Sequence, residues 1–267
     1  MVYRYNRRMR ADLGPLAFAL LVLVGGAAGF VDSIAGGGGM ITLPALLAAG
    51  LPPHLALGTN KLQSSFGSLT AALRYRAAGI VRFRDMVPGI AATAAGACAG
   101  SLAVGAMDSR LLRILIPILL VAILAFLAIR PRFGLQQGAR KVGWLPFWIV
   151  AGLALGFYDG FFGPGTGTFW AMALVGLVGL DMRGATAHTK VVNFASNIVA
   201  LAIFLAAGSV LAPIGVAMGL AETAGALAGS RLVLRRGAVF VRAMTLGVTA
   251  AMVLYIVLRY WIRTPSG

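Results

Sequence analysis

Charged residues are scarce in this chain. They make up 11% of its 267 residues, and only seven are acidic, whereas hydrophobic residues make up 60% and the mean hydropathy is +0.90. Soluble globular domains carry about 25% charged residues. The composition therefore excludes an ordinary soluble domain and indicates that most of the chain lies in a lipid bilayer.

Cysteine is nearly absent, and the common enzyme motifs are wholly absent. The single cysteine, Cys98, excludes an internal disulfide framework and a cysteine metal site, and we expect it to pack within a predicted span. The sequence contains no H-E-x-x-H, C-x-x-C, Walker A or G-x-S-x-G motif. We therefore expect no enzymatic activity, no metal and no cofactor, and we expect any transport to run on gradients.

Long apolar stretches recur along the whole chain. A helix needs about 20 residues to cross a bilayer, and suitable stretches occur at residues 13–33, 58–78, 86–106, 111–129, 144–162, 188–207, 212–230 and 239–258. Two shorter apolar pieces, 39–50 and 166–179, follow glycine-rich stretches and are interpreted as half-helices or re-entrant segments. The predicted fold is an all-α integral membrane protein with about eight transmembrane helices.

The net charge of +16 comes from basic residues gathered around the spans. Three clusters are separated by even numbers of predicted crossings, so we expect them on one face, which the positive-inside rule makes cytoplasmic. They are Arg4, Arg7, Arg8 and Arg10; Arg74, Arg76, Arg82 and Arg84; and Arg130, Arg132, Arg140 and Lys141. Both termini are then cytoplasmic, whereas Arg110, Arg113, Arg235 and Arg236 fall on the opposite face. An alternative count, with the half-helices as full spans, puts more basic residues outside.

The same distribution of charge predicts the partners. Basic residues beside membrane spans indicate anionic lipid headgroups as partners, and not nucleic acid. The sequence also allows a homo-oligomer.

The chain contains an internal duplication. Residues 29–40, GFVDSIAGGGGM, match residues 156–167, GFYDGFFGPGTG, at an offset of 127, and from residue 50 onward an offset of 129 pairs Lys61 with Lys190. We therefore predict two homologous four-span halves, each with a broken or re-entrant helix. The predicted organisation is a basic N-terminus (1–12), a first repeat (13–132), a basic linker (133–143), a second repeat (144–259) and a tail (260–267).

Duplicated halves are a common plan of secondary transporters, whose substrate sites form between the repeats from interrupted helices. An even number of spans in each half predicts parallel repeats, whereas an odd number, which the half-helices allow, would make them inverted. Each half also has a G-x-x-x-G, from Gly96 to Gly100 and from Gly225 to Gly229, which allows close helix packing.

The glycine-rich stretches are expected to break helices inside the membrane. Glycine costs about 1 kcal/mol of helix stability and proline about 3 kcal/mol, so a new helix should begin near Met40 and near Thr166. The N-terminus of each new helix exposes N–H groups and carries about half a positive charge, which favours an anion. The expected contacts are Gly37, Gly38, Gly39, Gly165 and Thr166; a tight turn without a ligand is the alternative.

Two lysines lie at matching positions in apolar helices. Lys61 and Lys190 would each cost about 2.5 kcal/mol or more in lipid, so such residues usually mark pathways or paired sites. The alternative is that both lysines extend to the membrane interface. The polar side chains around them support an oxyanion site, and the predicted ligands are Asn60, Gln63, Ser64, His188, Thr189, Asn193 and Asn197.

Two aspartates complete the symmetric set. Asp32 and Asp159 could neutralise the lysines, or their protonation could release the lysines to an anion and couple transport to protons. Glu222 has no acidic counterpart, because its matched position is Thr93, and it is either a second proton carrier or a structural acid.

The quoted segments, together with LGTNKLQSSFGS and ATAHTKVVNFASN, resemble the TauE/SafE family of bacterial membrane proteins, the sulfite exporter group, and most of all its YfcA-type branch. The resemblance covers nearly the whole chain. It implies a multi-pass carrier of the bacterial cytoplasmic (inner) membrane with two homologous halves. It also implies efflux or uptake of sulfite, sulfoacetate or other small sulfur-containing or organic anions.

We therefore expect a secondary transporter, most plausibly an exporter, of small anions such as sulfite or organosulfonates. Two alternatives are an anion channel, which needs a continuous wet path, and a membrane assembly subunit without transport of its own. The subunit alternative gives no reason for buried lysines beside broken helices.

Overall fold

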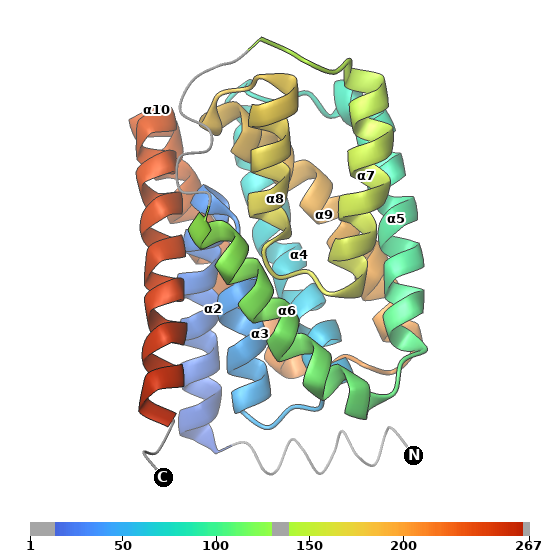
Figure 1. Cartoon of the computed structure of the whole chain (residues 1–267), viewed down its shortest axis with the longest axis vertical. Coiled ribbons are helices and arrows are strands. Elements are labelled where there is room, and N and C mark those ends of the chain that lie inside the picture. Colours follow the sequence, from blue (N-terminus) through green and yellow to red (C-terminus); the bar gives the residue numbers. More distant parts are fainter. Residues whose placement is uncertain (1–13, 130–138, 264–267) are drawn as a thin grey trace.

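The computed structural model describes residues 14–129 and 139–263, and the regular structure in these two ranges is all helical (Figure 1). The elements are α2 (Pro15–Ala35), α3 (Gly38–Ala48), α4 (Pro53–Ala77), the short η1 (Phe83–Met86), α5 (Val87–Gly105), α6 (Ser109–Ile129), α7 (Trp144–Phe161), α8 (Thr166–Ala173), the π-helical η2 (Leu174–Val178), α9 (Met182–Ala206) and α10 (Ala212–Arg263). The predicted all-α class is confirmed.

Five helices among the described residues are long and apolar enough to cross a membrane: Pro15–Ala35, Phe83–Gly105, Trp144–Phe161, Met182–Ala206 and Ala212–Val241. Helix α4 corresponds to the predicted span 58–78 but is more polar than the five helices above. Neighbouring helices bury its polar side chains. The predicted spans 111–129 and 239–258 are helical, and their side chains lie partly outside the described residues. The predicted total of eight thus remains a prediction.

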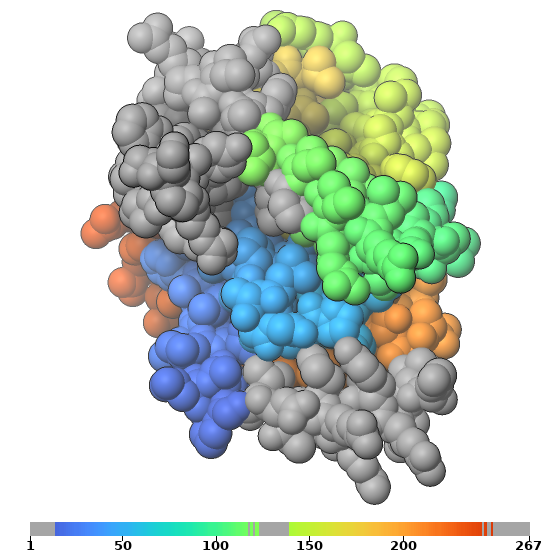
Figure 2. All heavy atoms as spheres, turned by 60° about the horizontal axis from the view of Figure 1, so that its bottom comes forward, coloured from blue at the N-terminus to red at the C-terminus, as the bar shows by residue number. Residues whose placement is uncertain are grey.

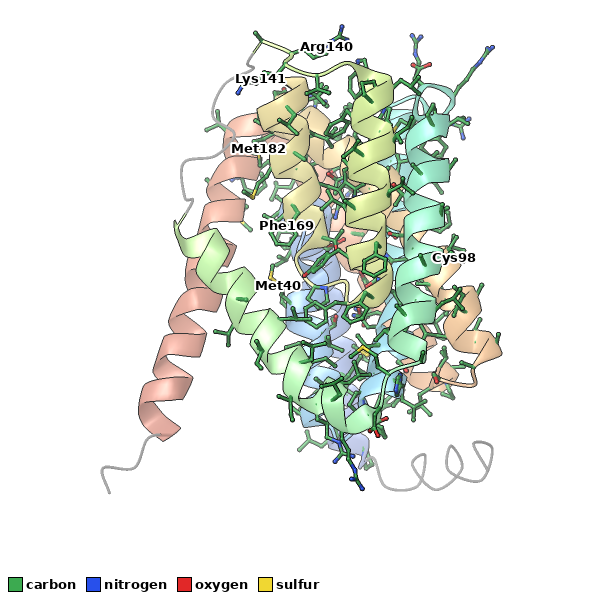
Figure 3. The ribbon with its side chains drawn as sticks, turned by 45° about the vertical axis from the view of Figure 1, so that its right-hand side comes forward. Met40, Cys98, Arg140, Lys141, Phe169 and Met182 are labelled. Atoms are coloured by element: carbon green, nitrogen blue, oxygen red, sulfur yellow. The ribbon has the colours of Figure 1, made fainter. Side chains whose placement is uncertain are left out.

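Both glycine-rich stretches break a helix, as predicted. Gly36 and Gly37 separate α2 from α3 with φ of 74° and 96°, and Gly163 and Gly165 separate α7 from α8 with φ of 96° and 83°. Residues with a Cβ rarely adopt such positive φ values, so glycine is required at these turns. Figure 3 places Met40 and Phe169, which lie in the first turns of α3 and α8, near the middle of the molecule's length.

The two broken helix pairs enter the molecule from opposite ends. Helix α2 begins at the end of the molecule where α10 also ends (Figure 1), whereas α7 begins at the other end, just after Arg140 and Lys141 (Figure 3). Helix α3 then turns back toward the end from which α2 came, as α8 does toward the end from which α7 came. Gly237, with φ of 70°, interrupts α10 between the predicted spans 212–230 and 239–258.

This path corrects the predicted distribution of charge. Because α3 adds a segment between α2 and α4, the connection with Arg82 and Arg84 lies at the end opposite to the start of α2. Arg235 and Arg236 also lie at that end, since the neighbouring Leu234 packs in one apolar cluster with groups such as Phe83 and Trp144. The even count of crossings was therefore wrong. The first cluster, Arg4, Arg7, Arg8 and Arg10, and the residues Arg130 and Arg132 lie outside the described residues.

The long helices pack in two tight pairs, α10 on α2 and α5 on α7. Glycine allows the backbones to touch: a Cβ on Gly96 would collide with Leu153 and Phe157, and a Cβ on Gly225 would collide with Gly26 and Phe30. The close helix approach predicted for both G-x-x-x-G motifs is confirmed.

Two apolar clusters fill the interior on either side of a polar middle. One cluster contains Leu57 and Phe204, from near the start of α4 and the end of α9, and the other contains Tyr75 and Val192. Between them, both helices bury polar residues such as Lys61 and Lys190. The polar middle therefore lies deep in the protein, where the two helix breaks also lie.

The outer surface is apolar, as a bilayer requires. Large side chains are exposed on several helices, among them Leu23, Leu102, Ile114, Val150 and Leu220. Cys98 lies half-buried on the outward side of α5 (Figure 3), in agreement with a packing role. Figure 2 shows α6 lying obliquely across the face that the first helices form.

The tight glycine contacts make a direct prediction about stability. We expect Gly100→Ala to destabilise the protein by about 1–3 kcal/mol, because the added Cβ collides with the Phe157 carbonyl oxygen. Gly105→Ala is the matched control, since nothing lies within 4 Å of its added Cβ. Thermal unfolding of both variants in detergent measures the difference, and equal melting temperatures would contradict the packing.

Candidate functional site

A polar cavity lies between the two broken helices. Its lining comes from both breaks and from the middle of α4 and α9: Asp32, Gly37, Gly39, Asn60, Lys61, Ser64, Asp159, Gly163, Gly165, Thr166, Gly167, Asn193 and Asn197. The cavity has a volume of about 30 Å³. A single water needs roughly 10–15 Å³, so the cavity is large enough to hold more than one water.

Two buried ion pairs cross between the N-terminal and C-terminal parts of the chain. Lys61 on α4 contacts Asp159 on α7, with Nζ 2.6 Å from Oδ1, and Lys190 on α9 contacts Asp32 on α2, with Nζ 2.8 Å from Oδ2. The lysines are 2% and 0% exposed, which excludes the alternative that they extend to the membrane interface. Each pair thus joins a helix of the N-terminal part, α2 or α4, to a helix of the C-terminal part, α7 or α9.

The two pairs are held differently. Asp159 is buried and also accepts a hydrogen bond from the Ser196 hydroxyl, and Lys61 donates a second bond to Asn197 Oδ1 at 3.2 Å. Asp32 accepts a bond from the backbone N–H of Gly38 at 3.2 Å, and its side chain is 16% exposed. The Lys61 pair is therefore enclosed, whereas the Asp32 carboxylate is the more accessible of the two.

The N-termini of α3 and α8 meet beside these pairs. Their N-cap residues are Gly37 and Gly165, and neither has a side chain that could cap the exposed N–H groups. Gly36 of one break lies against Gly167 of the other, where an added Cβ would stand 2.7 Å from the Gly167 carbonyl carbon. The positive ends of two helix dipoles thus converge on one small space.

Several predicted residues do not line this cavity. Lys190 and Gly38 contact Asp32 from outside the lining. Thr189 and Gln63 are buried elsewhere, with Gln63 beside the side chain of Glu222. Glu222 is buried on α10.

His188 is also absent from the lining. Its ring stacks on Trp144 and Trp148, with centroids 5.8 and 6.4 Å apart, and Nδ1 contacts the Gly184 carbonyl oxygen at 2.8 Å. The ring therefore belongs to an aromatic cluster at the start of α9.

Four residues near the cavity were not among the predicted site residues. Gly163 and Gly167 line it, Ser196 binds Asp159, and Thr42 accepts a hydrogen bond from Asn60 Nδ2 at 2.6 Å. The helical spacing of Ser196 from Asn193 was the only signal for it. Thr42 gave none, because its role depends on the contact of α3 with α4.

Comparison with known proteins assigns the family. The family described as "Sulfite exporter TauE/SafE" matches residues 21–256. The chain belongs to the TauE/SafE family. It is 42% identical over 240 residues to "Probable membrane transporter protein YfcA" of Escherichia coli (strain K12), covering 90% of this chain and 89% of the relative.

Two other TauE/SafE relatives are similar over most of their length. "Probable membrane transporter protein ORF9" of Sinorhizobium sp. is 40% identical over 257 residues, covering 94% of this chain and 98% of the relative. A "Probable membrane transporter protein" of Haemophilus influenzae is 39% identical over 233 residues. No solved structure matches the chain. The predicted resemblance is confirmed, and the chain is a multi-pass membrane protein of a transporter family.

The crossed pairing can be tested by double-mutant cycles on thermal stability. Lys61→Met alone should cost about 3–5 kcal/mol, because it leaves Asp159 buried without its cation. Adding Asp159→Asn should recover much of that loss, whereas adding Asp32→Asn should be much closer to additive. Melting temperatures of the purified variants measure this. A stronger coupling of Lys61 to Asp32 than to Asp159 would contradict the crossed arrangement.

Proposed function

We propose that this protein is a secondary transporter that exports small anions such as sulfite or organosulfonates, and that its substrate binds in the cavity between α3 and α8. The observation that carries the proposal is the convergence of two helix N-termini, each with a glycine as its N-cap residue, beside two buried lysines. The description of the matching family as a sulfite exporter supports the substrate class and the direction.

The charges around the cavity fit a monoanion. Each lysine is already balanced by an aspartate, so the four side chains contribute no net charge. The two helix N-termini add about half a positive charge each, or about one unit in total. An anion of one negative charge would balance these dipoles, and the amide groups of Asn60, Asn193 and Asn197 can supply further hydrogen bonds.

We also propose that a proton accompanies the anion. A carboxylate beside a bound anion repels it, whereas a protonated aspartate leaves its lysine free to bind the anion. Asp32 and Asp159 both line the cavity and bind the lysines, so either is in position to act. Coupling of this kind would link the movement of the anion to that of a proton.

We propose further that the chain consists of two inverted repeats. Matching contacts support it, since Gly96 meets Leu153 as Gly225 meets Gly26, and α2 and α7 start at opposite ends (Figure 1). Inverted repeats around a central site with broken helices are a known plan of secondary transporters. Each repeat then contributes one helix break, one lysine and one aspartate to the site.

We place the protein in the bacterial inner membrane with cytoplasmic termini. Four arginines precede the first span, and the first helix usually dominates orientation even where other basic connections, here those with Arg82 and Arg84, lie at the other end. A fluorescent protein that matures only in the cytoplasm, fused after Gly267, should fluoresce. A dark fusion, with the same protein fused to a periplasmic reporter active, would contradict this orientation.

Flux into liposomes tests the function. Purified protein should carry labelled sulfite, methanesulfonate or acetate with saturation and with exchange across the membrane, which distinguishes a carrier from a channel. Lys61→Ala and Lys190→Ala should each abolish flux, because each leaves an unpaired carboxylate at the cavity. Lys141→Ala, which changes an exposed lysine, should transport normally.

Two results would overturn the proposal. Normal flux in both lysine variants would remove the site, and absence of saturable flux of any of the three anions would remove the substrate class. Size-exclusion profiles that match the wild-type protein establish that a loss of flux does not reflect misfolding.

A further inference from the structure

Glu222 is a buried acid without a cation. It lies on α10, is 1% exposed, and takes part in neither of the two ion pairs among the described residues. Its Oε2 atom has no hydrogen-bond partner there, and the polar group that α4 places beside it is the uncharged amide of the completely buried Gln63. A carboxylate buried without a cation is costly, by several kcal/mol. The stable form of Glu222 is therefore the neutral acid, which carries a proton.

Two glycines make room for this carboxyl group. A Cβ added to Gly29 on α2 would stand 2.6 Å from Glu222 Cγ, and a Cβ added to Gly67 on α4 would collide with the carboxyl group itself. Asp32 follows Gly29 by three residues and so lies on the same face of α2. Glu222 thus stands next to the helix face that carries the accessible aspartate.

The matched position in the other half explains what Glu222 replaces. The offset that pairs Lys61 with Lys190 also pairs Gly67 with Ser196, Gln63 with Val192 and Glu222 with Thr93. Ser196 donates its hydroxyl to Asp159. Gly67, the residue that matches Ser196, has no side chain. The carboxyl group of Glu222 occupies the space that a side chain at Gly67 would take.

We propose that Glu222 is the proton-exchanging group of the transporter, standing at Asp32 where Ser196 stands at Asp159. This inference rests on the proposed function. A protonated carboxyl group and a hydroxyl each offer one O–H donor, but only the carboxyl group releases its proton readily. Proton coupling therefore occurs at the Lys190–Asp32 pair, whereas the Lys61–Asp159 pair is a fixed part of the anion site.

The proton transfer involves few charged groups. Asp32 on α2 and Lys190 on α9 are the charged groups that act on Glu222, and α4 offers the uncharged Gln63. When the proton moves from Glu222 to Asp32, the negative charge moves to Glu222 and Lys190 loses its carboxylate partner. Lys190, which lies directly behind Asp32, then attracts the entering anion. The proton leaves Asp32 together with the anion, and Glu222 takes up a new proton from water, which restores the first state.

Infrared spectroscopy tests the protonated acid without any substrate. The wild-type protein should show the C=O stretching band of a buried carboxylic acid, and Glu222→Gln should lack it. Asp85→Asn, which removes an exposed carboxylate, is the control and should keep the band. An unchanged band in Glu222→Gln, or no such band in the wild-type protein, would overturn the inference.

Transport of methanesulfonate tests the coupling, because this anion keeps its charge over the pH range used. One pH unit across the membrane should give about tenfold accumulation if one proton accompanies each anion. We expect Glu222→Gln to keep exchange at equal pH and to lose that accumulation. Pronounced accumulation in Glu222→Gln would overturn the inference but leave the carrier intact. If methanesulfonate is not carried, sulfite is compared between the two proteins at each pH.

A second variant rebuilds the serine arrangement at Asp32. Glu222→Thr with Gly67→Ser copies the residues of the other half, so it should fold and exchange anions without a proton. Gly67→Ser alone should lower the melting temperature, because its side chain collides with Glu222. If Gly67→Ser is as stable as the wild-type protein, or if the double variant keeps accumulation, Glu222 does not hold the proposed place.

Discussion

Two crossed ion pairs in the middle of a membrane protein determine most of what surrounds them. Lys61 and Lys190 are too costly to bury alone, so each needs a carboxylate, and each finds it on a helix from the other part of the chain. The broken helices follow from the same constraint. Asp159 and Asp32 reach the middle only because α7 and α2 end there, and α8 and α3 begin a few residues later.

Glycines support this arrangement in two places, at the two helix breaks and along the long helices. At the breaks, positive φ values turn the chain sharply, and α3 and α8 each begin after an N-cap glycine that has no side chain; at α3 the N–H group of Gly38 binds Asp32 instead. Along the long helices, glycines bring α10 against α2 and α5 against α7, so that no large side chain separates the backbones. The tight helix pairs hold the two helix breaks in place, and a polar cavity with room for more than one water is left between the breaks.

Much of this could be predicted from residues that are unusual in lipid. A lysine, an aspartate or a run of glycines in an apolar stretch has few structural explanations, so Lys61, Asp32 and Gly37 were readily found. The partner of each lysine could not be predicted, because pairing within a half and pairing between halves fit the same spacing. His188 was assigned to the site from its distance to Lys190 along the helix, yet its ring lies in an aromatic stack with Trp144.

The direction of the second half was the harder problem. Sequence length shows that residues 39–50 and 166–179 are short, but whether a short helix counts as a crossing depends on how its neighbours pack. Because α3 turns back toward the end from which α2 came, the number of crossings before α4 differs by one from the predicted number. The connection with Arg82 and Arg84 therefore lies at the opposite end from the one predicted. Glu222 and Gly67 show the same limit at a finer scale, since only the packing of α10 on α4 brings them together.

The most direct test of the central claim is to locate a bound anion. Crystals or membranes prepared with selenite, a heavy analogue of sulfite, allow its position to be found from the scattering of selenium. The anion should lie between the first turns of α3 and α8, within hydrogen-bonding distance of Lys61 or Lys190. Selenite bound only at the basic ends of the helices, in a protein that carries selenite, would contradict the account.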